Sequence, residues 1–334
     1  MTICNLPLHL PKFHRLVQLV HDINLVKNHL DAEELVAIPT ETVYGLAAKG
    51  TSENALRKIF KAKKRPSNNP LILHFSDLES IAPYVMELTD DIKLLAKEFW
   101  PGPLTLLLPK SNLVPEMVTA GSERVGVRIP NHPITLNLLK TLDYPLAAPS
   151  ANPSGYISPT RPEHVAQQLG NEIDLILDGG PTESGIESTI LGWENEMPVI
   201  YRKGVITSEQ IRNVLGTHPK FKNKSKVLEA PGMMSSHYAP FTEMVITENL
   251  TATVNAFQGK KIGLLTFKKT EGFPVEKEVV LSPNGTLEEM AKNLYAAMYD
   301  LDTLSLDVII AEKAPDVGVG KAINDRLLRS STKK

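Results

Sequence analysis

Apolar and polar positions alternate between strand-like and helix-like patterns over the first two thirds of the chain. Residues 35–38 form a short apolar run that ends in Pro-Thr, which predicts a strand leading into a loop. Between residues 52 and 64 the apolar side chains are spaced as on one face of a helix, and Ser52 is its expected N-cap. Strands are also predicted at 71–75, 104–108, 125–129, 146–148, 175–177, 189–191 and 199–201, and helices at 91–100, 133–140 and 162–169. This alternation is typical of a layered α/β domain.

A second unit follows a polar segment. Residues 216–230 carry lysines at every second position from 220 to 226, which we interpret as a solvated linker and not as an RNA-binding strip. Strands are then predicted at 244–247, 261–267 and 307–311, and helices at 286–302 and 320–328. This pattern predicts a small, doubly wound, Rossmann-like domain that lacks the G-x-G-x-x-G motif. We therefore divide the chain into a first domain at 13–210, a linker at 211–242 and a C-terminal domain at 243–334.

Composition is that of a soluble globular protein. Hydrophobic residues make up 42% and charged residues 22% of the 334 positions, enough for two domains with apolar cores. The single cysteine, Cys4, cannot form an internal disulfide, which indicates a reducing compartment. The N-terminus does not read as a signal peptide, and no stretch approaches the roughly 20 apolar residues of a membrane span. We expect a cytoplasmic protein without membrane contact, and the net charge of −2 favours a small anionic ligand over a long polyanion.

The richest chemical signal is the segment KAKKRPSNNP at residues 61–70. Its cations close a predicted helix, where the helix dipole alone would favour them. Two prolines, however, bracket the polar turn that follows and fix where Lys63 and Arg65 point. Arginine suits bidentate phosphate binding, and lysine serves as a point charge. The segment is therefore a candidate phosphate site.

Small polar residues gather in AAPSANPSGYISPT, after the predicted strand at 146–148. Ligands of open α/β sheets bind beyond the carboxyl ends of strands, and small hydroxyl and amide groups there approach phosphate oxygens closely. A plain loop of proline, serine and glycine explains this segment equally well. The segment Gly318-Val319-Gly320-Lys321 lacks the spacing of a P-loop, and we interpret it as the turn that begins a helix.

Other segments carry side chains that suit a ligand. PTETVYGL at 39–46 is predicted as a strand-to-helix exit whose hydroxyls cap the helix or face a ligand. Arg128 alternates with apolar residues in RVGVRIP, so it requires either a ligand carboxylate or a structural salt bridge. GIESTI at 185–190 places hydroxyls at the start of a strand, and YRKG at 201–204 places two cations after one. We find no Ser-His-Asp order and no metal-ligand spacing, which favours chemistry by positioning and charge stabilisation, as in nucleotidyl transfer.

Seven segments in order resemble the YrdC-like threonylcarbamoyl-AMP synthases: PTETVYGL, KAKKRPSNNPLILHF, FWPGPLTLLL, VGVRIPNHP, APSANPSG, GIESTI and YRKG. PGMMSSHYAP at 231–240, followed by a second domain, resembles the long, two-domain members. The resemblance implies an α/β fold with a YrdC-like open twisted mixed sheet and a concave basic cavity, plus a smaller Rossmann-like C-terminal domain. It implies an L-threonylcarbamoyladenylate synthase, a nucleotidyltransferase that converts L-threonine, bicarbonate and ATP with Mg²⁺ to threonylcarbamoyl-AMP and pyrophosphate. The product would pass to tRNA threonylcarbamoyl transferase proteins, which modify tRNA beside the anticodon.

The matching positions imply roles for individual residues. The resemblance assigns catalysis to Lys63 and Arg65 and no residue to a resident metal. It assigns ATP binding to Lys63, Arg65, Asn69, Arg124, Ser150, Asn152, Ser158, Arg202 and Tyr238, and threonine binding to Thr42, His74, Arg128, Ala148 and Ser188. The linker would close over ATP, although Met234 and Ser236 stand where basic residues are frequent.

Two alternatives stay open on the sequence alone. One is a tRNA- or double-stranded-RNA-binding module without catalysis, which would use the basic cavity and the linker lysines. The net charge of −2 and the absence of an aromatic-basic stacking pattern count against it, although a weak tRNA contact is compatible with the enzyme. The other is a related carbamoyl or acyl-phosphate enzyme that acts on a different amine.

Overall fold

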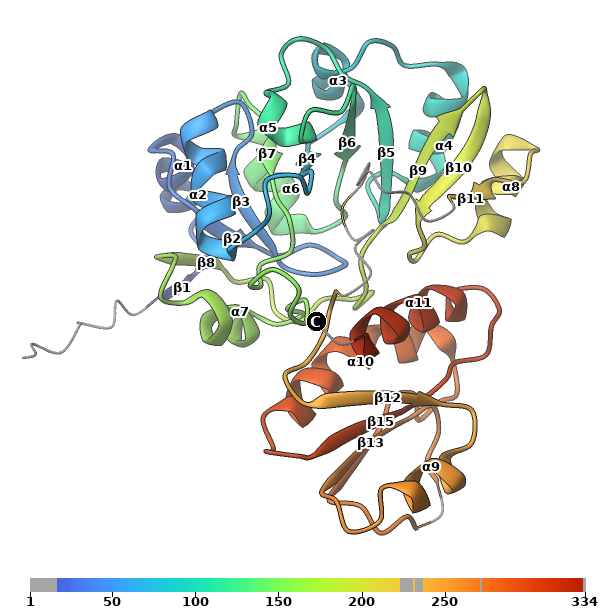
Figure 1. Ribbon diagram of the computed structural model, residues 1–334. Coiled ribbons are helices and arrows are strands. Elements are labelled where there is room, and N and C mark those ends of the chain that lie inside the picture. Colours follow the sequence, from blue (N-terminus) through green and yellow to red (C-terminus); the bar gives the residue numbers. More distant parts are fainter. Residues whose placement is uncertain (1–16, 223–230, 232–236, 271, 333–334) are drawn as a thin grey trace, which may run out of the picture.

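The computed structural model describes residues 17–222, 231, 237–270 and 272–332, which form two units (Figure 1). Cys4, Met234 and Ser236 lie outside the described residues. The first unit is built on an 11-stranded mixed sheet and the second on a 4-stranded parallel sheet. Both features confirm the predicted fold class. No helix among the described residues has the length and apolar character that crossing a membrane requires.

The first sheet mixes parallel and antiparallel neighbours. In spatial order its strands are β1 (Gln18–Val20), β8 (Leu175–Leu177), β2 (Val36–Ile38), β3 (Gly45–Lys49), β7 (Leu146–Ala147), β4 (Ile72–His74), β6 (Arg124–Arg128), β5 (Leu104–Pro109), β9 (Thr189–Glu194), β10 (Met197–Arg202) and β11 (Lys220–Phe221). Strands β4 and β6 are parallel, whereas β7 runs antiparallel to β4. These directions decide which strand ends meet.

Helices cover the first sheet. They are α1 (Ile23–Asp31), α2 (Glu53–Lys63), α3 (Leu78–Ile81), α4 (Asp90–Phe99), α5 (Glu116–Thr119), α6 (Pro133–Lys140), α7 (Pro162–Leu169) and α8 (Ser208–Leu215), with a 3₁₀ turn η1 (Ala82–Tyr84). The spacing of apolar residues predicted helix α2 correctly, because Ala55, Leu56 and Ile59 are fully buried on one face of the helix. Ser52 caps it, accepting a hydrogen bond from the Ala55 amide at 3.2 Å. The helix ends where Lys64 adopts a left-handed conformation (φ 50°).

The sequence prediction was wrong immediately after residue 44. PTETVYGL does not lead into a helix, because its last two residues begin β3, which pairs with β2 and β7 before α2 begins. The reason is composition: β3 reads GLAAK, and its glycine and alanines carry little apolar pattern. It forms a strand because its neighbours supply the ladder, and four of its five residues are buried. Helices α1, α3, α5 and α8 and strands β1 and β11 were also not predicted.

The second unit is an α/β layer. Its strands in spatial order are β12 (Glu243–Thr247), β15 (Val308–Glu312), β13 (Ile262–Thr266) and β14 (Lys277–Val280), all parallel to their neighbours. Helices α10 (Leu287–Asp302) and α11 (Gly320–Ser331) cover the face toward the first unit, and α9 (Leu250–Ala256) covers the other (Figure 1). Helix α11 begins at Gly320, so the Gly-Val-Gly-Lys segment is the turn before a helix, as predicted.

The two units meet along a close seam, which we define as the contact of residues 185–187 with α10 and α11. One apolar cluster includes Ile186 of the first unit and Met290 and Leu294 of α10. Gly185 has φ 72°, and a Cβ built there would lie 2.3 Å from the Lys292 carbonyl oxygen. Only glycine allows so close an approach of this loop to the helix backbone. The seam therefore depends on backbone packing as well as on side chains.

Candidate active site

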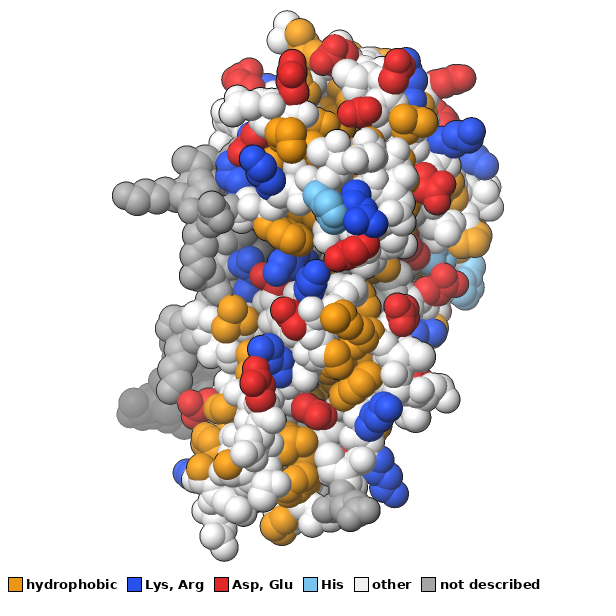
Figure 2. Space-filling model, turned by 90° about the vertical axis from the view of Figure 1, so that its right-hand side faces the viewer, with side chains coloured by type: hydrophobic (Ala, Val, Ile, Leu, Met, Phe, Trp, Pro, Cys, Tyr) orange, Lys and Arg blue, Asp and Glu red, His pale blue; other side chains and the backbone are white. Residues whose placement is uncertain are grey.

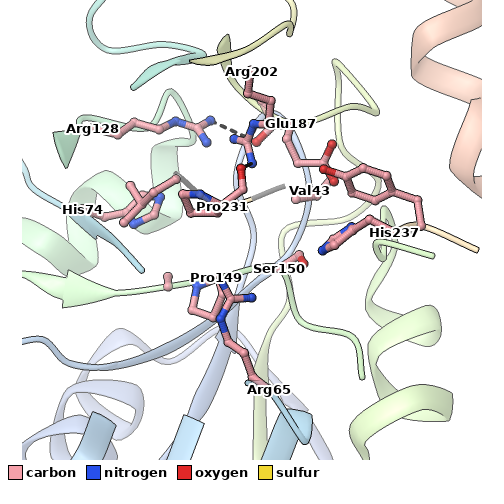
Figure 3. Close-up of a pocket in the computed structure, with 14 residues that line it drawn as sticks. Val43, Arg65, His74, Arg128, Pro149, Ser150, Glu187, Arg202, Pro231 and His237 are labelled. Carbon is pink, nitrogen blue, oxygen red and sulfur yellow. Dashed lines mark hydrogen bonds between the residues drawn. The ribbon is translucent and has the colours of Figure 1, made fainter. Parts of the chain in front are cut away.

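A cavity lies over the first sheet, beside the second unit. Its lining residues are Thr42, Val43, Arg65, Ile72, His74, Arg128, Ala148, Pro149, Ser150, Glu187, Arg202, Pro231, His237 and Tyr238. Figure 3 shows Arg65 entering from one side and Arg128 and Arg202 from the other. Three guanidinium groups thus converge on one space, which makes the cavity a site for anions.

Strand directions place the cavity across the face of the sheet. His74 and Arg128 are paired neighbours at the carboxyl ends of β4 and β6. Because β7 is antiparallel to β4, Ala148 lies beside the opposite end of β4, where its amide bonds the Ile72 carbonyl at 3.1 Å. The candidate ligand-binding residues therefore lie at the ends of their strands. The ends lie on opposite sides of the cavity and do not share one edge.

Arg65 is buried and rigidly held. Its Nη2 donates to Asn69 Oδ1 and to the Pro70 carbonyl, both at 2.7 Å, and its Nε donates to the Asn69 carbonyl at 3.1 Å. The turn between two prolines thus orients the guanidinium, as the sequence suggested. Burial lowers the pKa of Arg65 to about 9, and the group stays charged at neutral pH.

Arg202 lies on the other side, tied to the start of β9. Its Nε donates to the Ser188 carbonyl at 3.0 Å and its Nη2 to Ser188 Oγ at 2.9 Å. Its Nη1 lies 3.4 Å from the Pro231 carbonyl. These bonds join the GIESTI and YRKG segments into one structural unit at the cavity, although Ser188 and Arg202 lie 14 residues apart in the sequence.

Arg128 forms a structural salt bridge with Glu41. Its Nη2 lies 2.8 Å from the Glu41 carboxylate and donates to Thr42 Oγ1 at 3.0 Å. Its Nε reaches the Gly102 carbonyl at 3.3 Å. These contacts occupy one edge of the guanidinium, while the residue also lines the cavity. The sequence left open whether Arg128 pairs with a structural carboxylate or with a ligand carboxylate. The structure is compatible with both, because Glu41 fixes one edge of the guanidinium and the other edge can meet a ligand carboxylate.

Among the described residues of the cavity lining, Glu187 is the one carboxylate, and the sequence reasoning did not single it out. It accepts hydrogen bonds from Ser158 Oγ at 2.7 Å and from Arg326 Nε at 2.8 Å. Burial alone would raise the pKa of Glu187, but the charges of Arg326 and Arg202 outweigh it and lower this pKa to about 2. Glu187 is therefore ionised and already neutralised, so the cavity keeps its positive character.

Lys63 does not face the cavity. Its ammonium donates to the carbonyls of Ser150 and Asn152, and so it fixes the loop after β7 from behind. Burial, and then repulsion from Arg65, lower the pKa of Lys63 well below its usual value. Bound negative charge in the cavity would favour the ammonium form again.

Several buried polar atoms of the lining lack a hydrogen-bond partner within the described residues. They include Nδ1 of His74, Nδ1 of His237 and the hydroxyl of Tyr238. Burial lowers the pKa of His74 and of His237 to about 3, so both rings are neutral at physiological pH. Buried polar atoms are nearly always satisfied in functional states, so these atoms indicate that a polar ligand or water occupies the cavity.

The structure brings together most residues that the sequence suggested. The lining includes Thr42, Arg65, His74, Arg128, Ala148, Ser150, Arg202 and Tyr238. Six others lie outside it: Lys63, Asn69, Arg124, Asn152, Ser158 and Ser188. Lys63, Asn69, Ser158 and Ser188 each bond directly to a lining residue, and Asn152 lies in the loop that follows the lining residue Ser150 and accepts a hydrogen bond from Lys63. Arg124 lies at the far end of β6, where its Nη1 donates to the Tyr201 hydroxyl at 2.7 Å.

Sequence reasoning did not select two polar residues of the described cavity lining, Glu187 and His237. Glu187 stands inside a quoted motif, as does Glu41, which pairs with the lining residue Arg128. A carboxylate near predicted anion-binding arginines offered no reason to select it. His237 lies beside Tyr238 within the predicted linker and lines the cavity with it. The hydroxyls of Thr40 and Tyr44 bond the backbone instead, at Val43 and Gly180. An internal partner can be identified only once the fold is known.

Two family models cover the chain in succession. The Sua5/YciO/YrdC model, described as "Telomere recombination", matches residues 28–204. A model described as "Threonylcarbamoyl-AMP synthase, C-terminal domain" matches residues 206–332. The cavity draws residues from both ranges, because Tyr238 falls in the second.

Known proteins match over nearly the whole chain. A Pyrococcus abyssi protein named threonylcarbamoyl-AMP synthase is 40% identical over 323 residues. The match covers 92% of this chain and 94% of the P. abyssi protein. A Bacillus subtilis protein of that name is 42% identical and covers 90% of each. The crystal structure of P. abyssi Sua5 complexed with L-threonine has a TM-score of 0.86 at 38% identity, covering 92% and 94%. Escherichia coli YciO shares the fold of the first unit, with a TM-score of 0.52 at 24% identity over 57% and 92%.

Proposed function

The chain belongs to the Sua5-type threonylcarbamoyl-AMP synthases, and from that premise we propose that it joins L-threonine, bicarbonate and ATP into threonylcarbamoyl-AMP, releasing pyrophosphate. It is an ATP-using transferase of the nucleotidyltransferase type. The observation that carries the proposal is the convergence of Arg65, Arg128 and Arg202 on one buried cavity. Such a cavity suits a substrate pair that carries a triphosphate and a carboxylate.

ATP would take the side of the cavity formed by Arg65, Ser150 and Arg202. Asn69 holds the Arg65 guanidinium, and Lys63 holds the Ser150–Asn152 loop, so both support this side without facing it. Ser158 and Tyr238 would contribute to ATP binding on the side of the cavity that adjoins the second unit. A direct contact of Arg124 with ATP stays a prediction, because its guanidinium bonds Tyr201 outside the lining.

Threonine would lie between Arg128, Thr42 and His74. The free edge of Arg128 would pair with the amino-acid carboxylate, since Glu41 occupies the other edge. Thr42 and neutral His74 offer groups that bond a hydroxyl or an amine without repelling it. Ala148 limits the space, and a contact of Ser188 with threonine stays a prediction, because Ser188 lies outside the lining and bonds Arg202. The selection of threonine over other amino acids is part of the proposal.

The chemistry would proceed by positioning and charge stabilisation. The threonine amine, once deprotonated, attacks the carbon of bicarbonate or of the CO₂ derived from it, and a carbamate forms with loss of water. A carbamate oxygen then attacks the α-phosphorus of ATP, and the bond to the β-phosphate oxygen breaks to release pyrophosphate. Negative charge grows on the phosphates as this bond breaks, where Arg65, Arg202 and the nearby Lys63 stabilise it. No side chain of the cavity is needed as a nucleophile.

Magnesium would enter bound to ATP. Among the described residues no three histidine, cysteine or acidic side chains are grouped as metal ligands. The two carboxylates of the site, Glu41 and Glu187, are engaged by arginines. Mg²⁺ is commonly held by substrate phosphates and water with few protein ligands, which fits this set of residues.

The product would be passed to tRNA-modifying proteins that transfer the threonylcarbamoyl group. The RNA-binding alternative is not favoured, because the relatives that match nearly the full chain are named as synthases. Figure 2 shows basic and acidic side chains interspersed over the face it displays, which does not suit a long polyanion. A cytoplasmic location and a weak tRNA contact stay predictions.

The test is pyrophosphate release from ATP with each amino acid, with and without bicarbonate. We expect release that requires both threonine and bicarbonate, with threonylcarbamoyl-AMP identified by mass spectrometry. The double variant Lys63→Ala/Arg65→Ala should lose most of this activity. Arg57→Ala on the exposed side of α2 is the control, since Arg57 forms a surface ion pair with Glu53 and does not line the cavity. Release that ignored threonine, or a double variant with full activity, would contradict the proposal.

A further inference from the structure

The second unit reaches the cavity through one buried arginine. Arg326 of α11 is fully buried, and its Nε lies 2.8 Å from the Glu187 carboxylate. Its Nη2 donates to the Lys203 carbonyl at 2.8 Å, and its Nη1 bonds Asp325 at 2.7 Å. A buried guanidinium with all three nitrogens engaged is fixed in direction. Arg326 therefore joins two separate segments of the first unit, one at Glu187 and one at Lys203.

Helix α10 adds a second hold on the same carboxylate. The Tyr295 hydroxyl donates to Glu187 Oε2 at 3.0 Å, and Tyr295 is fully buried. From the first unit, the Ser158 hydroxyl donates to this carboxylate at 2.7 Å. Among the described residues, two of the three side chains that donate hydrogen bonds to Glu187 thus come from the second unit.

The residues next to these contacts form the ATP side of the cavity. Ser188 follows Glu187, and Arg202 precedes Lys203, so Arg326 binds the chain directly beside both. Arg202 and Ser188 bond each other at 2.9 Å. The backbone at Gly204 packs tightly against the start of β9, because a Cβ built there would lie 2.3 Å from the Thr189 amide nitrogen. A shift of Glu187 or Lys203 would therefore move the Arg202 guanidinium.

The contact between Arg326 and Glu187 balances charge beside the cavity in addition to packing the two units together. Glu187 lines the cavity, and the charge of the cavity residue Arg202 helps to lower its pKa. If the charge of Glu187 were not matched by Arg326, the carboxylate would compete with phosphate for Arg202. The titratable and charged groups around Glu187 are Arg326 from α11, Tyr295 from α10, Arg202 from β10, and His237 with Tyr238, while Asp325 pairs with Arg326. Of the two cations, Arg202 lines the cavity and Arg326 does not.

We infer that Arg326 and Tyr295 of the second unit are positioning residues for the reaction: they hold and neutralise Glu187 from behind, so that Arg202 stays available to the nucleotide. The inference rests on the proposed function, and it gives the second unit a direct part in the ATP site. It assigns no contact with substrate to either residue.

The experiment compares Arg326→Met, Arg326→Lys and Glu187→Gln/Arg326→Met with the wild-type protein. Threonine-dependent pyrophosphate release gives KM for ATP and threonine, and calorimetry gives ATP affinity. In Arg326→Met we expect KM for ATP to rise about tenfold or more, with KM for threonine changed less than about threefold. Arg326→Lys should retain most of the affinity. The double variant should recover much of the loss, because the unmatched carboxylate is gone.

Lys321→Met is the matched control. Lys321 also lies on α11 and pairs across the units with Glu209 at 3.2 Å, but it does not line the cavity. Its loss should leave KM for ATP unchanged. If Arg326→Met lowers only the melting temperature and leaves ATP affinity and the pH profile intact, Arg326 is merely structural and the inference is wrong. A double variant as impaired as Arg326→Met would overturn the charge-matching reason.

Tyr295→Phe keeps the test valid if Arg326→Met fails to fold. It removes one hydroxyl and should raise KM for ATP by about threefold, whereas an unchanged KM would contradict the inference. Wild-type protein without threonine-dependent release would instead refute the proposed function. The ATP affinities of the same variants would then still decide the positioning role, so the two failures are distinguishable.

Discussion

Gly185→Ala should loosen the contact between the two units and weaken ATP binding. Gly185 has φ 72°, and its position against α10 leaves no room for a side chain. An added Cβ would lie 2.3 Å from the Lys292 carbonyl oxygen and 2.4 Å from that of Ala291. Both are backbone atoms of a helix, so neither can rotate away. The loop that carries Glu187 must then move relative to α10.

Two costs add up in this variant. A left-handed conformation costs a non-glycine residue about 1–2 kcal/mol. Overpacking against a rigid neighbour costs a further ~1–3 kcal/mol. Gly216→Ala separates them, because Gly216 has φ 69° at the end of α8 and nothing within 4 Å of its Cβ position. The difference between the two variants should therefore be about 1–3 kcal/mol.

Denaturation followed by two probes measures this difference. Both tryptophans, Trp100 and Trp193, lie in the first unit, so their fluorescence reports that unit alone. Far-ultraviolet circular dichroism reports both units. We expect Gly185→Ala to lower the urea midpoint by circular dichroism and to raise KM for ATP, whereas Gly216→Ala should lower the midpoint less and leave KM unchanged. Equal midpoints and equal KM values in the two variants would refute the steric reasoning.

Three further outcomes are expected. Arg128→Gln should raise KM for threonine by about tenfold or more while KM for ATP changes little, and a reversed pattern in steady-state kinetics would contradict the assignment of the Arg128 edge to the amino acid. Arg65→Lys should raise KM for ATP by about tenfold, because lysine cannot bond Asn69 Oδ1 and the Pro70 carbonyl in the same geometry; Arg57→Lys is its surface control. Stability should fall as the pH drops below 6.5, since burial lowers the pKa of His74 and His237 to about 3 while the unfolded chain protonates both near 6.5. At pH 5 each ring should cost about 2 kcal/mol, and His74→Gln should reduce the pH dependence of the urea midpoint; an unchanged dependence would argue against a neutral buried ring.

Local pattern was sufficient for most elements of the fold. Helix α2 was predicted because its buried face, its serine cap and its terminal cations all agree within one segment. Strands β13 and β15 of the second unit were predicted because they are buried apolar runs, whereas the more exposed strand β14 and the short helix α9 were not predicted. Strand β3 was missed because glycine and alanine carry little pattern, and its pairing partners come from elsewhere in the chain.

The sequence by itself determined which chemistry this protein carries: the cations, small hydroxyls and turns of its motifs, and the family they resemble. Only the tertiary structure decided how those groups are used. Lys63 faces a loop instead of the cavity, Arg128 shares its charge with Glu41, and Glu187 meets Arg326 from the second unit. The physical reason is that a side chain's charge is local, whereas its partner and burial depend on residues that lie as far as 139 positions away along the chain.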